Sequence, residues 1–133
     1  MEVITLEELR EKEAVLAQMA REDGESLVST TELRLSQGKY ARLKLEYLEK
    51  VNPVQIMIWE EFPWEQIQYL SRVQQQALQM KQLMMKQLIT KRRITEELKL
   101  RNPMLWAQKM TTAQSEVEEV ILHDLIYTGS NRP

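Results

Sequence analysis

The longest stretch of the chain without a helix-breaking residue constrains the fold most. Neither glycine nor proline occurs between Pro63 and Pro103, and residues 74–88 read QQQALQMKQLMMKQL. Every residue type in that segment favours a helix. We predict one long helix over about 63–101, which at a rise of 1.5 Å per residue is about 57 Å long. A helix of this length needs neighbours along its sides.

The apolar residues of this predicted helix form a broad stripe. A heptad repeat places on one seam Leu70, Val73, Ala77, Met80, Met84, Ile94 and Leu98. Gln87 and Lys91 interrupt this seam, whereas Ile67, Leu78, Met85 and Ile89 widen the stripe to about half of the circumference. A two-stranded coiled coil has a narrower stripe. We therefore expect at least two neighbours, from this chain or from other copies, in a helical bundle or coiled-coil-like packing.

Capping signals mark the remaining helices. Thr5 with Glu8 and Ser29 with Glu32 fit the capping box, Gly24 is suited to the end of the first helix, and Gly38 interrupts the second. The predicted fold is all-α, with short capped helices around one long central helix. It is a single helical domain over 1–133, with helices over about 6–22, 30–51, 53–62, 63–101 and 103–127 and a polar tail over 128–133.

Two Asn-Pro pairs, Asn52-Pro53 and Asn102-Pro103, each precede a segment that contains tryptophan. Asparagine is a good N-cap, and proline suits the first position of a helix. The two pairs are compatible with an internal duplication, but such short matches also arise by chance. We favour the interpretation that each pair is an independent corner between two helices.

Composition excludes several classes of protein. The chain has no cysteine, so it forms no disulfide framework and has no thiolate metal site or cysteine nucleophile. The N-terminal segment MEVITLEELREKE is acidic, unlike a signal peptide, and no window approaches the roughly 20 apolar residues that span a bilayer. We expect a soluble, intracellular protein, located in the cytoplasm or in an assembled particle.

No combination of residues predicts catalysis, cofactor binding or a metal site. His123 is the only histidine, and Glu119 lies one helical turn before it. Metal sites in helical bundles draw their ligands from several helices, so this pair does not predict one. We expect a side-chain contact between Glu119 and His123 on the helix surface. The three glycines lie too far apart to form a phosphate-binding loop. We therefore expect that the protein is not an enzyme.

Charge is unevenly distributed along the chain. Residues 1–25 hold eight acids and three bases, whereas residues 66–95 hold six bases and no acid. One interpretation is that nucleic-acid phosphates are contacted by Lys86, Lys91, Arg92, Arg93, Lys99 and Arg101. The other is that the basic helix packs beside acidic helices of the same or a neighbouring subunit. The overall pI near 5.6 favours the second interpretation.

The segment IMIWEEFPW at residues 56–64 is the densest apolar run. We favour Trp59 in the core and Trp64 nearer an interface. The candidate interface residues are Trp59, Phe62, Trp64, Leu78, Met80, Met84 and Met85. A membrane-surface helix is disfavoured, because the apolar stripe is interrupted and the tryptophans lie outside it.

We expect a non-catalytic helical structural or adaptor subunit. Its long Gln/Met/Lys-rich helix would mediate assembly with other protein subunits, as a homo-oligomer or a hetero-complex, in a virion or another multi-subunit particle. The alternative is a helical nucleic-acid-associated protein that uses the basic end of the long helix.

Overall fold

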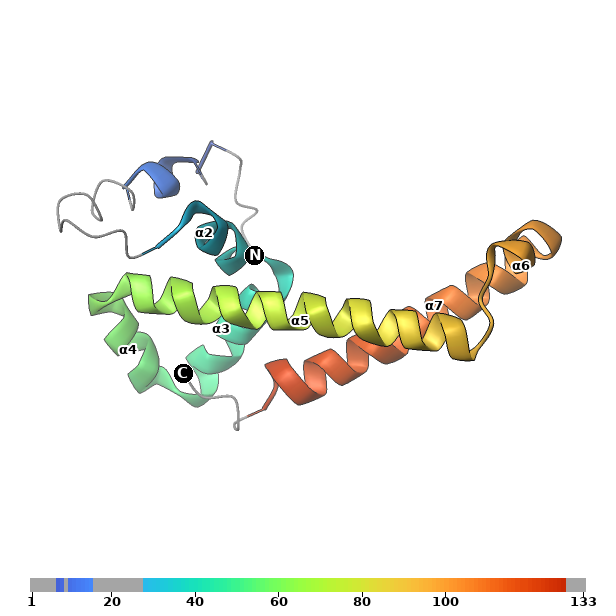
Figure 1. Cartoon of the computed structure of the whole chain (residues 1–133). Helices are drawn as coiled ribbons and strands as arrows, with labels where there is room; N and C mark the ends of the chain where they lie inside the picture. The colour runs from blue at the N-terminus through green and yellow to red at the C-terminus, as the bar shows by residue number, and fades with distance from the viewer. Residues whose placement is uncertain (1–6, 9, 16–27, 129–133) are drawn as a thin grey trace. The chain divides into compact units, whose positions relative to one another are not determined.

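The computed structural model describes residues 7, 8, 10–15 and 28–128, and within these ranges every regular element is a helix (Figure 1). The elements are α2 (Thr30–Ser36), α3 (Lys39–Val51), α4 (Pro53–Glu61), α5 (Pro63–Lys91), α6 (Glu96–Arg101), α7 (Pro103–Ile121) and a π-helical end, η1 (Leu122–Ile126). The all-α class with one long helix is confirmed. The chain divides into two compact units, Met1–Gln74 and Gln75–Pro133, and α5 continues through the boundary. The single domain stays a prediction.

The first predicted helix is described only in part. Residues 7, 8 and 10–15 are helical, whereas its capping box at Thr5 and its predicted end at residues 16–22 lie outside the described residues, as does the polar tail beyond Thr128. The Glu13 carboxylate accepts a hydrogen bond of 3.3 Å from the Arg34 Nε. This ion pair joins the segment to α2.

The predicted capping box at Ser29 is confirmed. The Ser29 Oγ accepts from the backbone N–H of Glu32 at 3.1 Å, and the Ser29 backbone N–H donates to the Glu32 carboxylate at 3.3 Å. Helix α2 ends after Ser36, and Gly38 is the N-cap residue of α3. The one helix predicted over about 30–51 is therefore wrong, because the chain forms two helices separated at the interruption by Gly38.

A glutamine from α5 completes the start of α3. The Gln74 Oε1 accepts hydrogen bonds from the backbone N–H groups of Tyr40 and Ala41, at 2.9 and 3.0 Å. Gln74 is only 6% exposed, and a Cβ at Gly38 would lie 2.2 Å from its Cδ. Glycine is therefore needed at position 38 because any side chain would displace the amide that caps α3.

The first Asn-Pro corner separates α3 from α4. The Asn52 Oδ1 accepts from the Gln55 backbone N–H at 3.3 Å, and Pro53 is the first helical residue. Trp59 of α4 is buried at 3% exposure, with its ring centroid 5.4 Å from that of Tyr69. The buried apolar residues of this unit are Leu33, Tyr40, Ala41, Leu48, Trp59, Ile67, Tyr69, Leu70 and Val73.

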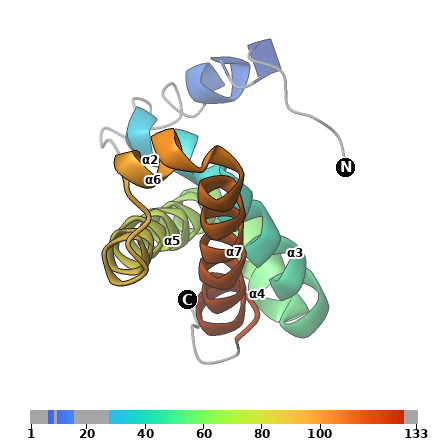
Figure 2. The same cartoon turned by 90° about the vertical axis from the view of Figure 1, so that its right-hand side faces the viewer.

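In the second unit, α7 lies beside the later part of α5 and runs in the opposite direction (Figures 1 and 2). Arg92 forms an ion pair with Glu116 of α7. Ala77, Ala113 and Val117 are among the buried residues of this unit. Small alanine side chains permit two helices to approach closely.

The predicted C-terminal end of the long helix is wrong. Helix α5 ends at Lys91 and is about 43 Å long, whereas residues 96–101 form the separate helix α6. The Ile94 N–H donates to the Ile89 carbonyl at 3.0 Å and the Arg93 N–H to the Thr90 carbonyl at 3.4 Å, which is the Schellman pattern. Arg93 takes the left-handed position with φ 53°. Glycine usually occupies this position, so its absence concealed the helix end.

A threonine then starts α6. The Thr95 Oγ1 accepts from the Leu98 backbone N–H at 3.1 Å, and Glu96 and Glu97 occupy the first turn, where the helix dipole favours acids. The change in sequence from KRR to TEE was therefore the available signal for this boundary.

The second Asn-Pro corner begins α7. The Asn102 Oδ1 accepts from the Leu105 backbone N–H at 3.2 Å. The last predicted helix is confirmed as α7 followed by η1, in which the Tyr127 N–H donates to the Leu122 carbonyl at 2.7 Å. None of the helices in the described ranges is long and apolar enough to cross a membrane.

Candidate interaction surfaces

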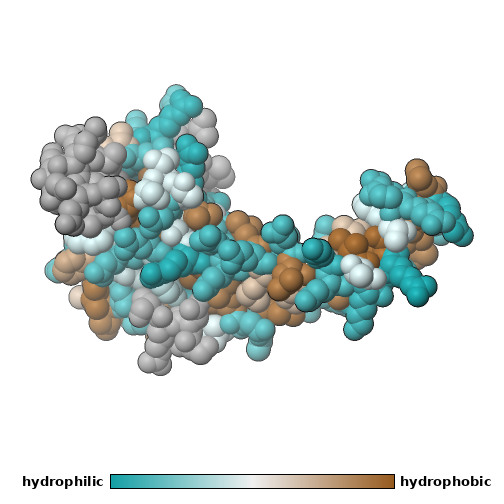
Figure 3. All heavy atoms as spheres, viewed as in Figure 1, coloured by the Kyte–Doolittle hydropathy of each residue, from teal (hydrophilic) through white to brown (hydrophobic). Residues whose placement is uncertain are grey.

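The first candidate surface follows α4. It consists of large apolar side chains with substantial exposure, and we call it the α4 face: Val51 (54%), Val54 (64%), Met57 (66%), Ile58 (43%) and Phe62 (39%). Hydrophobic atoms are visible over α4 in Figure 3. Contiguous apolar surface of this kind marks interaction sites on soluble proteins.

The sequence of α4, PVQIMIWEE, explains why these residues are exposed. Apolar residues lie on every side of this short helix, so one side cannot bury them all. Trp59 is the buried residue of α4. The residues on the other sides are left at the surface.

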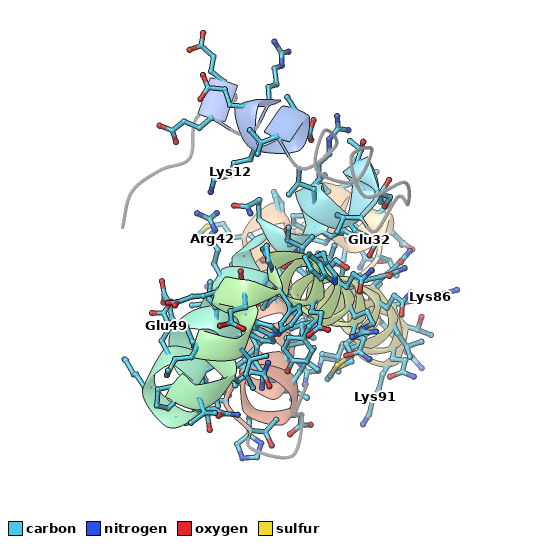
Figure 4. The ribbon with its side chains drawn as sticks, turned by 90° about the vertical axis from the view of Figure 1, so that its left-hand side faces the viewer. Lys12, Glu32, Arg42, Glu49, Lys86 and Lys91 are labelled. Atoms are coloured by element: carbon cyan, nitrogen blue, oxygen red, sulfur yellow. The ribbon has the colours of Figure 1, made fainter. Side chains whose placement is uncertain are left out.

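Acidic residues lie close to those of the α4 face in the sequence. Glu49, Glu60, Glu61 and Glu65 are all exposed, with Lys50 as the exposed base among them. The Glu49 side chain extends away from the ribbon (Figure 4). The exposed apolar residues of the α4 face are therefore accompanied along the chain by four exposed acids and one exposed base.

The predicted interface residues differ in accessibility. Trp59 lies in the core, so its side chain is not available as surface, whereas Phe62 is exposed and Trp64 is half-buried. The Phe62 and Trp64 rings meet edge to face, with centroids 5.5 Å apart. Leu78 is exposed, and the three methionines, Met80, Met84 and Met85, are half-buried.

Sequence reasoning missed Val54 and Met57, which are the two most exposed members of the α4 face. The signal was present, because a nine-residue helix with apolar residues on all sides exposes some of them wherever one side is packed.

The predicted phosphate-contacting residues lie around the end of α5 and along α6. Arg92 pairs with Glu116, and Arg101 pairs with Glu97 at 3.0 Å. The Lys99 Nζ lies 4.7 Å from the centroid of the Trp106 ring. Within the described ranges Lys86, Lys91 and Arg93 form no ion pair, and Lys86 and Lys91 extend away from the helix (Figure 4).

Two open hollows lie beside these cations. One, of about 490 Å³, is lined by Arg92, Leu105, Gln108, Lys109 and Thr112. The other, of about 500 Å³, is lined by Arg93, Thr95, Glu97, Leu98, Arg101, Asn102 and Leu105. Leu105 lines both hollows, so they adjoin.

Two titratable groups outside these surfaces have pKa values that burial shifts. Burial lowers the pKa of Lys44, and burial raises the pKa of Tyr69 to about 12, which Arg72 partly offsets. His123, for which a contact with Glu119 is predicted, has its Nδ1 2.8 Å from the Asp124 Oδ1. Among the described residues no group of three or more His, Cys, Asp or Glu side chains is placed to hold a metal ion.

These observations define the class: an all-helical protein whose described part presents an apolar helix face, with acids close to it in the sequence, and a separate cluster of cations. The sequence pattern of a protein family, described as transposon-encoded protein TnpV, matches residues 26–126. Because this match spans most of the chain, the chain belongs to that family. No curated protein and no solved structure matches it significantly.

Proposed function

We propose that this protein is a non-catalytic helical subunit that assembles with another protein through the α4 face. The observation that carries the proposal is the exposure of Val54, Met57 and Ile58 on a helix that is apolar on all sides. Such a helix is ordinarily buried, and covering its exposed residues would release the water ordered around them.

The packing beneath α4 supports a preformed docking surface. The contact of Trp59 with Tyr69 attaches the helix to α5, and the Asn52 cap and Pro53 define its start. A surface that is already ordered loses little conformational entropy on binding. The α4 face is therefore suited to recognise a partner without rearrangement.

The charge near the α4 face supports a partner of complementary charge. Four glutamates lie close to it in the sequence: Glu49, Glu60, Glu61 and Glu65. The complementary partner is an amphipathic helix with apolar residues along one side and lysine or arginine at their margin. Exposed Leu78 and half-buried Met84 of α5 provide a second contact region, in keeping with assembly through the long helix.

The family description names a transposon as the source of the gene and no activity. The search for the partner therefore begins with proteins encoded by the same element, together with a second copy of this chain. A virion particle has no support in this description, and the proposal does not rest on one.

Light scattering on a sizing column, at low and high salt and with the 260/280 nm absorbance ratio recorded, tests for self-assembly. Co-purification with each protein of the same transposon tests for a hetero-complex. Met57→Asp should abolish the assembly, because it places a charge in the centre of the α4 face. Met104→Asp is the matched control, since Met104 is also exposed (75%) but lies on α7.

Loss of the complex in Met57→Asp alone would support the proposal. It would be overturned by a wild-type monomer that captures none of these proteins, or by equal effects of the two substitutions.

A further inference from the structure

The turn that joins α5 to α6, residues 91–95, combines backbone strain with positive charge, and we call it the basic turn. Arg93 has a φ of 53°, a left-handed backbone conformation that residues other than glycine and asparagine rarely adopt. The Schellman hydrogen bonds to Ile89 and Thr90 hold it there. An arginine therefore occupies a position at which glycine would be more stable.

The surroundings of the basic turn are rich in cations. Residues 91–109 hold six bases and two acids. Each of the two adjoining hollows has two cations in its lining, Arg92 with Lys109 in one and Arg93 with Arg101 in the other. Glu97 lines the second hollow and is held by Arg101.

Two cations of the basic turn are available for a ligand. Within the described ranges Lys91 and Arg93 are exposed and form no ion pair with a carboxylate. The Lys109 Nζ approaches the Arg92 carbonyl oxygen at 3.5 Å, which holds its charge beside the turn. The hollow that Arg92 and Lys109 line has two further hydrogen-bond donors in its lining, the Gln108 amide and the Thr112 hydroxyl.

We propose that the basic turn binds the phosphate backbone of duplex DNA without reading its sequence. Arginine and lysine side chains at neighbouring hollows suit successive phosphates of one strand. Recognition of single strands usually requires aromatic rings on which bases stack. Trp106 follows Leu105, the residue that lines both hollows. It is half-buried and has the Lys99 ammonium over its ring, so it offers no open surface on which a base could stack.

The test uses fluorescence anisotropy of a labelled 20-base-pair duplex of mixed sequence, titrated with the full chain at 50 and 200 mM salt. Two phosphate contacts, at Lys91 and Arg93, give a slope of log affinity against log salt of about −1.8, so affinity should fall roughly ten-fold over this range. Anionic phospholipid vesicles and a polyglutamate peptide are titrated in parallel as competing polyanions.

Arg93→Gly separates binding from folding. Glycine relieves the left-handed backbone, so the melting temperature should rise by about 2–5 °C. The same change should reduce the salt slope by about 0.9 and weaken binding to DNA, since one phosphate contact is lost. Lys50→Gln is the control, because it removes one exposed positive charge from α3, outside the basic turn.

A lower slope in Arg93→Gly but not in Lys50→Gln would support the proposal. It would be overturned by the absence of binding at 50 mM salt, by equal effects of the two substitutions, or by vesicles or polyglutamate binding more tightly than DNA.

Discussion

The two Asn-Pro corners have nearly the same backbone but different surroundings. Asn52 has φ −145° and ψ 65°, Asn102 has φ −146° and ψ 79°, and each side chain accepts from the backbone N–H three residues later. After the first corner Trp59 is buried against Tyr69, whereas after the second Trp106 is half-buried beneath the Lys99 ammonium.

The corner itself is a local structure, whereas the burial of the tryptophan that follows it depends on the packing of the unit around it. An asparagine N-cap and a proline at the first helical position specify the turn wherever they occur together. The same turn then introduces a helix with acidic neighbours and an exposed apolar face in one unit, and a helix with basic neighbours in the other.

The largest contrast is expected at the two tryptophans. Trp59→Ala should lower the free energy of unfolding by about 3–5 kcal/mol because it leaves a large cavity in the core. Trp106→Ala should cost about 1 kcal/mol, since its ring is partly exposed and its cation–π contact is weak in water. Urea denaturation followed by circular dichroism measures both. Equal losses would remove the distinction between the corners.

A smaller effect is expected where α5 caps α3. Gly38→Ala should cost about 2 kcal/mol, because the new Cβ displaces Gln74 and leaves two N–H groups without their acceptor. Gln74→Ala should cost a similar amount. The double variant should cost clearly less than the two single effects together, since both remove the same hydrogen bonds. Additive losses would show that Gly38 and Gln74 act independently.

The asparagine caps of the two corners should contribute less to stability, and by equal amounts. Asn52→Ala and Asn102→Ala should each cost about 1 kcal/mol, the usual value of an N-cap. Thermal unfolding of the two variants provides the comparison. A difference of more than about 1 kcal/mol would mean that the corners are not equivalent even locally.

The smallest expected effect is the contribution of Tyr69 to stability, which changes with pH only in alkaline solution. Burial raises the pKa of Tyr69 to about 12 from a usual value of 10.0. Between these values the unfolded chain has lost the proton that the folded chain retains, so this contribution to stability is complete below pH 10 and is lost as the pH rises through 12. Tyr69→Phe should remove this loss, measured by urea denaturation between pH 9 and 12. If Tyr69→Phe still loses stability over this pH range, the loss belongs to another titrating group.

Much of the fold was predictable because its signals lie within a few residues of one another. Ser29, Asn52 and Asn102 each accept a hydrogen bond from a backbone N–H three residues later, which explains the capping box and both Asn-Pro corners. The break before Pro63 follows because proline has no backbone N–H. The end of α5 was missed because arginine stands at a left-handed position where glycine is expected.

The candidate surfaces were less predictable, because exposure depends on which side of a helix is packed. The apolar residues around Trp59 were recognised, but the placement of Trp59 inside and of Met57 outside follows from the contact with Tyr69, ten residues further along the chain than Trp59. Similarly, charge is the one property of the sequence that indicates the six proposed phosphate-contacting residues. The structure distinguishes Arg92 and Arg101, which have carboxylate partners, from Arg93.

The helical class, the corners and the uneven charge follow from the sequence alone, since each is a property of neighbouring residues or of composition. Two features are visible only in the folded chain. Gln74 caps a helix that begins more than thirty residues earlier, and Gly38 must lack a side chain there. Contacts between residues so far apart in the chain depend on how the helices pack. No local pattern of residues encodes that packing.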